Sequence, residues 1–301
     1  MPLITHISDT ARWVAFYRAM ETERRDAIFR DPWARRLAGE RGERIVREMP
    51  RAHATAWAMI VRTAVMDELL MRLVTGGDTD LVLNLAAGLD TRPWRLDLPP
   101  TLRWVDVDFP DVLEYKHDGV RDAQPRCAYE GVGLDLADVP ARRALFERLG
   151  RSARAITVIT EGLLIYLTAD AVGALADDLH AQPSMRWWIL DVATPLLQQF
   201  IHRSWGSELR EGASPMRFFP AEGVDFYRAH GWTPDEFRST GEEAQRLHRE
   251  MRLAPLWRLL SRLSSAERRE AFRRMSGVAL LARAQDALRE DQGAGAGAAP
   301  S

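Results

Sequence analysis

The chain has 301 residues, of which 46% are hydrophobic, enough to bury one large core without stabilising cross-links. Its 41 basic and 43 acidic residues leave a net charge of −2, which excludes global attraction to nucleic acid or to an anionic membrane surface. A single cysteine, Cys127, excludes an intrachain disulfide framework, and the absence of a long apolar run or a signal-peptide pattern leads us to expect a cytoplasmic protein.

Helical and strand-like patterns alternate along the chain. Residues 9–24 and 51–74 have helical periodicity, and short apolar runs of strand length follow at 81–86, 103–107, 156–160, 187–192 and 277–282. Two segments between these runs, 139–149 and 169–181, are long enough for crossover helices. Because the apolar runs are continuous rather than alternating, we predict a doubly wound α/β fold with a mostly parallel sheet and helices on both faces.

The exit from the first predicted strand is built from small residues. Residues 81–96 read LVLNLAAGLDTRPWRL, and Gly88 lets the backbone approach a ligand or adopt a positive φ. The next strand ends at Asp106 and Asp108, and an acid about 20 residues after such a turn reaches a ribose diol. The pattern favours an adenosine-containing ligand, with close packing of a helix against the strand as the alternative. We expect Asp106 to be a solvent-facing charge.

The same turn lacks the usual phosphate-binding patterns, G-x-G-x-x-G and G-x-x-x-x-G-K-[ST]. It also carries Asp90, which would repel a pyrophosphate. An adenosine ligand with a cationic centre and no phosphate fits better, and S-adenosylmethionine is such a molecule. We expect Asp90 and Thr91 to cap the helix that begins near Pro93 rather than to touch this ligand.

Five segments of the chain resemble the leucine carboxyl methyltransferase family. They are ARWVAFYRAMETERRDAIFRDPWARRLAG at 11–39, VRTAVMDELL at 61–70, NLAAGLDTRPWRL at 84–96, VDVDFPDVLEYK at 105–116 and TEGLLIYLT at 160–168. The resemblance extends from about Thr10 to Leu281 and is strongest to the bacterial branch that contains O-methyltransferases of polyketide tailoring. It implies a class I S-adenosylmethionine-dependent methyltransferase with a Rossmann-like seven-stranded sheet and a helical lid.

The resemblance assigns cofactor contacts to the first half of the chain. Arg62 would pair with the methionyl carboxylate, and Arg30 would be a second partner for it, although Arg30 could equally pair with Asp31 or cap a helix. Gly88 would lie beside the methionyl and ribose portions. Ala86 stands where the family usually has glycine, and we expect its methyl group to weaken cofactor binding without abolishing it.

The resemblance assigns further contacts to three strand ends. Asp108 matches the acid that holds the ribose hydroxyls, and Asp135 and Leu136 match the pair that flanks the adenine. Glu161 matches the acid near the cofactor's amino group and the acceptor. We accordingly predict one domain over 1–290, followed by a disordered tail over 291–301. The domain comprises a helical cap (1–75), a cofactor-binding core (76–194), a lid with later strands (195–275) and a last strand (276–283).

Methyl transfer is an in-line displacement that requires no metal, and positioning contributes most of the acceleration. A carboxylate acceptor needs no base, whereas a phenol or alcohol usually does. No histidine lies in a sequence motif that indicates a catalytic role. The candidates for a catalytic role are His202, Tyr17 and Tyr166, with ordinary helix-surface or core packing as the competing interpretation.

We expect the acceptor pocket to form between the N-terminal helices and an aromatic insertion at 195–220. The aromatic residues concerned are Trp13, Phe16 and Tyr17 in the helices and Phe200, Trp205, Phe218 and Phe219 in the insertion. Flat aromatic walls suit a polyketide-like or aromatic acceptor. They can equally pin helices onto a sheet.

Three functions remain open on the sequence. The first is O-methylation of a small molecule, giving an ester or an ether, with no nucleic-acid or membrane partner. The second is methylation of a protein C-terminal carboxylate, against which the hydrophobic insertion argues mildly. The third is a different class, a nicotinamide-dependent oxidoreductase or a non-catalytic adenosine-binding protein. The missing dinucleotide glycine spacing counts against the oxidoreductase.

Overall fold

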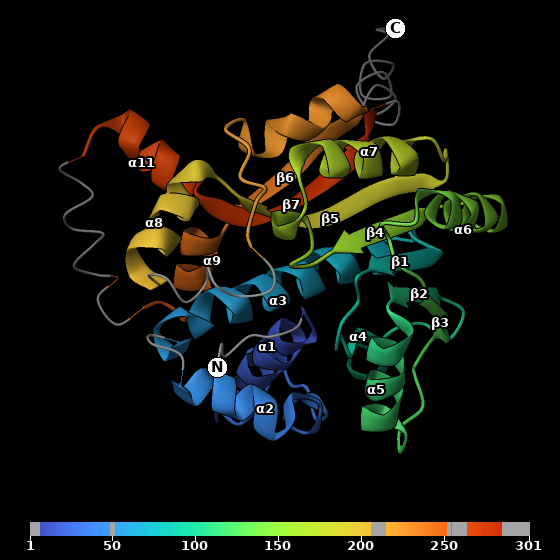
Figure 1. Cartoon of the computed structure of the whole chain (residues 1–301), viewed down its shortest axis with the longest axis horizontal. Coiled ribbons are helices and arrows are strands. Elements are labelled where there is room, and N and C mark those ends of the chain that lie inside the picture. Colours follow the sequence, from blue (N-terminus) through green and yellow to red (C-terminus); the bar gives the residue numbers. More distant parts are fainter. Residues whose placement is uncertain (1–6, 49–51, 206–214, 252–253, 255–263, 285–301) are drawn as a thin grey trace, which may run out of the picture.

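A computed structural model of the chain describes residues 7–48, 52–205, 215–251, 254 and 264–284 (Figure 1). Seven strands form one sheet in the order β3-β2-β1-β4-β5-β7-β6. The strands are β1 Leu81–Leu85, β2 Arg103–Asp108, β3 Ala128–Gly133, β4 Ile156–Thr160, β5 Met185–Ala193, β6 Trp232–Ser239 and β7 Ser276–Arg283. Strands β1 to β5 pair in parallel, and β7 is antiparallel to both β5 and β6. The predicted fold class is confirmed.

Helices cover both faces of the sheet (Figure 1). They are α1 Ile7–Thr22, α2 Ala34–Glu48, α3 Ala52–Thr75, α4 Arg92–Arg95, α5 Pro110–Val120, α6 Val139–Ser152, α7 Ala169–His180, α8 Pro195–Trp205, α9 Thr240–Arg246 and α11 Ala266–Arg273, with 3-10 turns η1 Leu164–Tyr166 and η2 Gly223–His230. Within the described residues, none of the helices is long and apolar enough to cross a membrane.

The core has three parts. Helices α6 and α7 bury their apolar faces on one side of the sheet, and α3 does so on the other. Every residue of β1 and β4 is buried, as their continuous apolar sequences predicted. Helices α1 and α2 pack together with α3 and form a cap beside the carboxyl ends of the central strands. Cys127 is buried in the α3 layer, and burial raises the pKa of its thiol to about 12.

The periodicity missed several of the described elements, among them β3, β6, α2 and α5. Strands β3 and β6 are the two edges of the sheet, where less of each strand is buried and a continuous apolar run is unnecessary. β3 reads AYEGVG, and β6 contains Pro234 beside an irregularity in its pairing with β7. The tail 291–301 and the side chains of His202 and Trp205 lie outside the described residues.

The strand order reverses between β1 and β4, which are neighbours in the sheet although they are far apart in sequence. In a doubly wound sheet, ligands bind beyond the carboxyl ends of the strands at such a switch point. The turn after β1, the end of β2, and the residues after β4 and near the end of β5 all meet at this edge. The fold therefore brings the predicted cofactor motifs together.

Candidate active site

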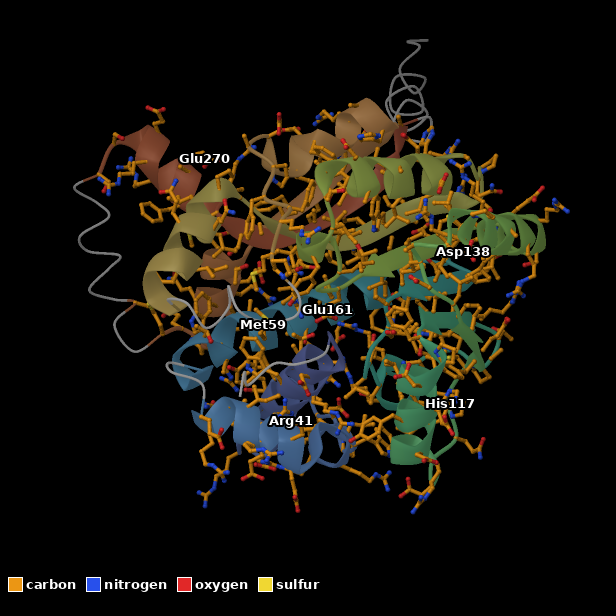
Figure 2. The ribbon with its side chains drawn as sticks, in the orientation of Figure 1. Arg41, Met59, His117, Asp138, Glu161 and Glu270 are labelled. Carbon is orange, nitrogen blue, oxygen red and sulfur yellow. The ribbon has the colours of Figure 1, made fainter. Side chains whose placement is uncertain are left out.

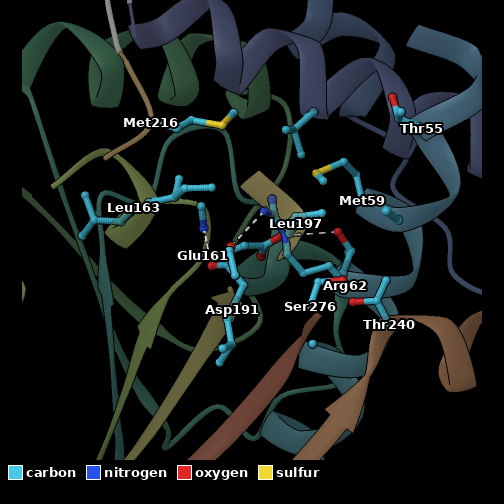
Figure 3. Close-up of a pocket in the computed structure, with 18 of the residues that line it drawn as sticks. Thr55, Met59, Arg62, Glu161, Leu163, Asp191, Leu197, Met216, Thr240 and Ser276 are labelled. Atoms are coloured by element: carbon cyan, nitrogen blue, oxygen red, sulfur yellow. Dashed lines mark hydrogen bonds and ion pairs between the residues drawn. The ribbon is translucent and has the colours of Figure 1, made fainter. Parts of the chain in front are cut away.

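One large cavity, about 1640 Å³ in volume, opens at the carboxyl ends of β1, β2, β4 and β5. Figure 2 places Met59 of α3 and Glu161 near the centre of the molecule, between the helical cap and the sheet, and Figure 3 shows both in the cavity wall. Seven of the eight predicted cofactor residues line it: Arg62, Ala86, Gly88, Asp108, Asp135, Leu136 and Glu161. The motifs far apart in sequence thus share one site.

The turn after β1 is held by the acid at the end of β2. Gly88 has a φ of +50° and donates its backbone N–H to Asp108 Oδ2 over 2.6 Å. The N–H of Phe109 donates to the other oxygen, Oδ1, over 2.7 Å. Burial raises the pKa of Asp108, and these two hydrogen bonds oppose that shift by favouring the carboxylate. The glycine and the acid that the sequence connected only by spacing are therefore in direct contact.

Ala86 has a φ of +52°, the left-handed conformation that glycine tolerates and that costs an alanine about 1–2 kcal/mol. The residue that departs from the family pattern is thus strained and also lines the cavity. We expect Ala86→Gly to raise the free energy of unfolding by about 1 kcal/mol, measured by chemical denaturation. Ala87, the neighbouring buried alanine without a positive φ, is the matched control, and Ala87→Gly should lower stability. Equal effects at both positions would contradict the strain.

The two residues predicted to flank the adenine, Asp135 and Leu136, line the cavity just after β3. Asp135 Oδ1 accepts the backbone N–H of Ala137 over 2.9 Å, which fixes the carboxylate at the start of this loop. The carbonyl of Leu136 accepts a hydrogen bond of 2.8 Å from Nη1 of Arg142. Arg142 is itself held by a buried ion pair with Asp178 of α7. Helices α6 and α7 thus position the loop that the resemblance places against adenine.

Seven charged residues form a continuous chain of ion pairs, and all of them except Asp67 line the cavity. We call this set the ion-pair cluster; its members are Arg62, Arg92, Arg95, Asp67, Asp90, Glu161 and Asp191. Arg92 is its centre, with a side chain only 1% exposed, and contacts Asp67 at 2.6 Å and Asp90 at 2.7 Å. A third contact joins Arg92 to Glu161 at 2.8 Å. The arginine after the small-residue turn therefore ties α3, the β1 exit and the β4 exit together.

Two members of the ion-pair cluster, Arg62 and Asp67, come from α3. Asp67 accepts from Arg95 at 2.6 Å, and Arg62 contacts Glu161 at 3.1 Å and Asp191 at 3.4 Å. No sequence motif pointed to a role for Asp67, Arg92, Arg95 or Asp191. The available signal was the presence of Arg92 in the turn and of Asp67 within the apolar helix VRTAVMDELL. Charges in such apolar segments need buried partners.

Glu161 is held ionised by its arginine neighbours. Burial alone would raise its pKa, but the charges of Arg92 and Arg62 outweigh burial and bring the pKa to about 2. Because the folded pKa lies below the unfolded value, Glu161 contributes stability that is fully present above about pH 4.5 and is lost as the pH falls toward 2. We expect Glu161→Gln to remove this part of the acid dependence. The measurement is the free energy of unfolding of the wild type and of Glu161→Gln from pH 7 to pH 2. If the difference in stability between the two proteins stayed constant over that range, the assigned contribution of Glu161 would be wrong.

Arg30 was predicted to be a second partner of the methionyl carboxylate, and the structure places it elsewhere. It is exposed, lies outside the cavity lining, and donates Nη1 to the carbonyl of Thr22, the last residue of α1, over 2.7 Å. It therefore caps that helix, which is the alternative considered for it. The neighbouring Asp31 is the buried member of this segment, paired with Arg18 at 2.8 Å and accepting from Thr91 Oγ1 at 2.7 Å.

The helix-cap prediction for the turn is right for one residue only. Asp90 Oδ1 accepts the N–H of Arg92 over 2.8 Å at the start of α4, as expected of a capping acid. Thr91 occupies the cap position without a side-chain cap bond, because its hydroxyl donates to Asp31 instead. Asp90 also lines the cavity and belongs to the ion-pair cluster, so capping is not its whole role.

The prediction that Asp106 faces solvent is wrong. Asp106 is fully buried and pairs at 2.7 Å with Lys116 of α5, whose side chain is also fully buried. Its Oδ1 accepts from Asn84 Nδ2 over 3.0 Å and from Trp104 Nε1 over 2.8 Å. A lysine ten residues downstream thus satisfies the acid and docks α5 on the sheet.

Some of the residues predicted for catalysis or for the acceptor pocket line the cavity, and others do not. Tyr166 lines the cavity, and burial raises the pKa of its hydroxyl. Tyr17 and Phe16 belong to the core of the helical cap and do not line the cavity. Of the other predicted aromatics, Trp13 and Phe200 line it, whereas Phe218 is buried in the sheet core.

Much of the remaining wall of the cavity is apolar, and charged residues of α9 and α11, such as Glu242 and Arg269, line it as well. The apolar part is formed by residues after β4, by one face of α8, and by later segments, including Leu163, Ile165, Leu197, Ile201, Met216 and Met275. Figure 3 shows Leu163, Leu197 and Met216 in this wall. The four exposed large hydrophobic side chains in the described part of the chain, Phe109, Phe200, Met251 and Phe272, all line the same cavity. Such a concentration of exposed apolar surface marks a binding site.

A model of the leucine carboxyl methyltransferase family matches residues 11–180. A protein of Streptomyces avermitilis that is 32% identical aligns over 75% of this chain and 83% of its own length, and one of Streptomyces coelicolor that is 34% identical aligns over 74% and 82%. Each is named "Putative S-adenosyl-L-methionine-dependent methyltransferase". A crystal structure of a DUF574 family protein from Streptomyces avermitilis, 16% identical, covers 93% of this chain and 98% of its own with a TM-score of 0.57.

These comparisons agree with the fold. The sheet, with five parallel strands and an antiparallel β7 inserted between β5 and β6, is that of class I methyltransferases. The family match spans more than half of the chain and contains the β1 turn, the β2 acid and the residues after β4. The chain therefore belongs to the leucine carboxyl methyltransferase family, a family of S-adenosylmethionine-dependent methyltransferases.

Proposed function

We propose that this protein transfers a methyl group from S-adenosylmethionine to an oxygen of a small-molecule acceptor, a carboxylate or a hydroxyl of a polyketide-like secondary metabolite. One observation carries the proposal: a single cavity joins the charged strand ends to a wall of apolar side chains. The charged end suits a zwitterionic, cationic cofactor, and the apolar end suits a ring system or an acyl chain.

The residues at the charged end fit this cofactor. Asp108 offers carboxylate oxygens to ribose hydroxyls, and Glu161 offers them to the ammonium group. Arg62 uses Nε and Nη1 for Glu161 and Asp191, and among the described residues its Nη2 has no partner, which leaves it for the methionyl carboxylate. The turn after β1 carries Asp90 and lacks a phosphate-binding amide row, in agreement with a ligand without phosphates.

The bound cofactor would supply an electrophilic methyl group, and the chain would contribute positioning and exclusion of water. Arg62 and Glu161 hold each other beside the β4 exit through an ion pair of 3.1 Å. The apolar wall would bury the body of the acceptor and leave its oxygen facing the charged end. The family assignment favours this reaction over the nicotinamide-dependent oxidoreductase that the sequence left open.

The test is incubation of the purified protein with cofactor carrying a deuterated methyl group and with a metabolite extract, followed by mass spectrometry. We expect a labelled small molecule. Mild alkaline hydrolysis then separates the two acceptor classes, because it removes the label from a methyl ester and leaves it on a methyl ether. In a parallel incubation with a protein extract, labelling confined to proteins, as a methyl ester of the C-terminal carboxylate, would overturn the small-molecule proposal and support methylation of a protein C-terminus.

A further inference from the structure

The ion-pair cluster is not electrically balanced. It contains three arginines and four acids, so it carries one surplus negative charge in the wall of the cavity. Lys116 and Asp106, joined to it through Asn84, form a neutral pair and do not change this sum. An uncompensated charge in a largely desolvated site is costly, and a cationic ligand would remove that cost.

The contact distances identify Asp191 as the surplus acid. Arg95 holds Asp67 through two nitrogens at 2.6 and 2.8 Å, and Arg92 holds Asp90 at 2.7 Å. Arg62 lies closer to Glu161, at 3.1 Å, than to Asp191, at 3.4 Å. Asp191 also has the most exposed side chain of the four acids, 19% against 11 to 16%.

Asp191 faces the space where a ligand would bind. It lies near the end of β5 and lines the cavity, and Figure 3 shows it below Glu161 and Arg62. Its Oδ1 accepts the backbone N–H of Gly162 over 2.7 Å, which fixes the carboxylate against the β4 exit. The remaining oxygen, Oδ2, has only the long contact with Arg62 among the described residues.

We infer that Asp191 determines specificity for the charge of the ligand, so that the site binds S-adenosylmethionine more tightly than its demethylated product, S-adenosylhomocysteine. This inference rests on the proposed function, since it places the cofactor in this cavity. The cofactor bears a sulfonium, an ammonium and a carboxylate and has a net charge of +1. The product has lost the sulfonium charge together with the methyl group and has no net charge. The surplus of the ion-pair cluster is therefore compensated before transfer and uncompensated after it, which favours product release.

The test compares wild-type protein with Asp191→Asn by calorimetric titration. The asparagine amide oxygen can still accept from Gly162, so the substitution removes the charge and keeps that contact. Three ligands are titrated: S-adenosylmethionine, S-adenosylhomocysteine and sinefungin, which carries a protonated amine in place of the methylated sulfonium. We expect the wild type to bind both cations on the order of tenfold more tightly than the neutral product, the effect of one charge across a partly desolvated site.

In Asp191→Asn the affinity for both cations should fall on the order of tenfold, with less than a twofold change for S-adenosylhomocysteine. Asp191→Glu should retain most of the preference. Asp97→Asn, at an exposed acid outside the cavity, is the matched control and should alter no affinity. Equal affinity of the wild type for the neutral product, or equal losses for all three ligands in Asp191→Asn, would overturn the inference alone. Failure of every ligand to bind the wild type would instead overturn the proposed function.

Discussion

Replacement of Asp108 by alanine should weaken S-adenosylmethionine binding on the order of 100-fold. A hydrogen bond to an ionised acceptor contributes about 1.5–3 kcal/mol, and 1.4 kcal/mol corresponds to a factor of ten. Asp108 is buried in the cavity wall, and the same carboxylate holds the N–H of Gly88 at 2.6 Å. The substitution therefore removes the proposed ribose contact and also releases the turn after β1.

Calorimetric titration of the cofactor measures this effect. Asp111→Ala is the matched control, because Asp111 is an exposed acid at the start of α5 and does not line the cavity. Asp108→Asn should have an intermediate effect, since its amide oxygen can replace only one of the two backbone contacts. An unchanged affinity in Asp108→Ala would show that the assignment of this acid to the ribose is wrong.

Replacement of Arg92 by methionine should destabilise the protein by about 4 kcal/mol. Removal of one partner from a buried ion pair typically costs about 3–5 kcal/mol, because the acid left behind remains buried without compensation. Arg92 has a side chain that is 1% exposed and contacts three acids, Asp67, Asp90 and Glu161. Methionine fills a similar volume, so the loss of charge rather than a cavity would dominate.

The measurement is the free energy of unfolding in urea, compared with Arg151→Met. Arg151 makes an ion pair with Glu147 on the surface of α6, with side chains 71% and 56% exposed, so its loss should cost less than about 1 kcal/mol. If Arg92→Met does not fold, Arg92→Lys keeps a charge at the centre and allows the comparison. Equal costs at the two sites would mean that the ion-pair cluster does not hold the three segments together.

The sequence predicted the central strands and the turn after β1 because their chemistry is local. A run such as LVLNLA cannot be exposed along its length, and it became β1, buried throughout. Gly88 and Asp108 could be identified for the same reason, because the backbone freedom of glycine and the spacing of the acid after it are visible in the sequence. The edge strands β3 and β6 were missed because their partial exposure removes the requirement for an apolar run.

The sequence could not show which charged residues are buried in ion pairs and which are exposed. Asp106 and Arg30 are both charges beside predicted motifs, yet Asp106 is fully buried and Arg30 caps α1 at the surface. What separates them is the position of partners, and in the ion-pair cluster those partners lie far away along the chain. Arg62 is 99 residues from Glu161 and 129 from Asp191.

The sequence by itself thus determined the fold class, the family motifs and the strand ends that line the cavity, because burial of apolar runs and the conformation of small residues depend on local composition. Only the tertiary structure decided which charges are paired, that Arg92 connects three segments, that Ala86 is strained, and that Asp191 is the surplus acid. A charge can be buried only where opposite charges from other segments meet it, and folding alone brings those segments together.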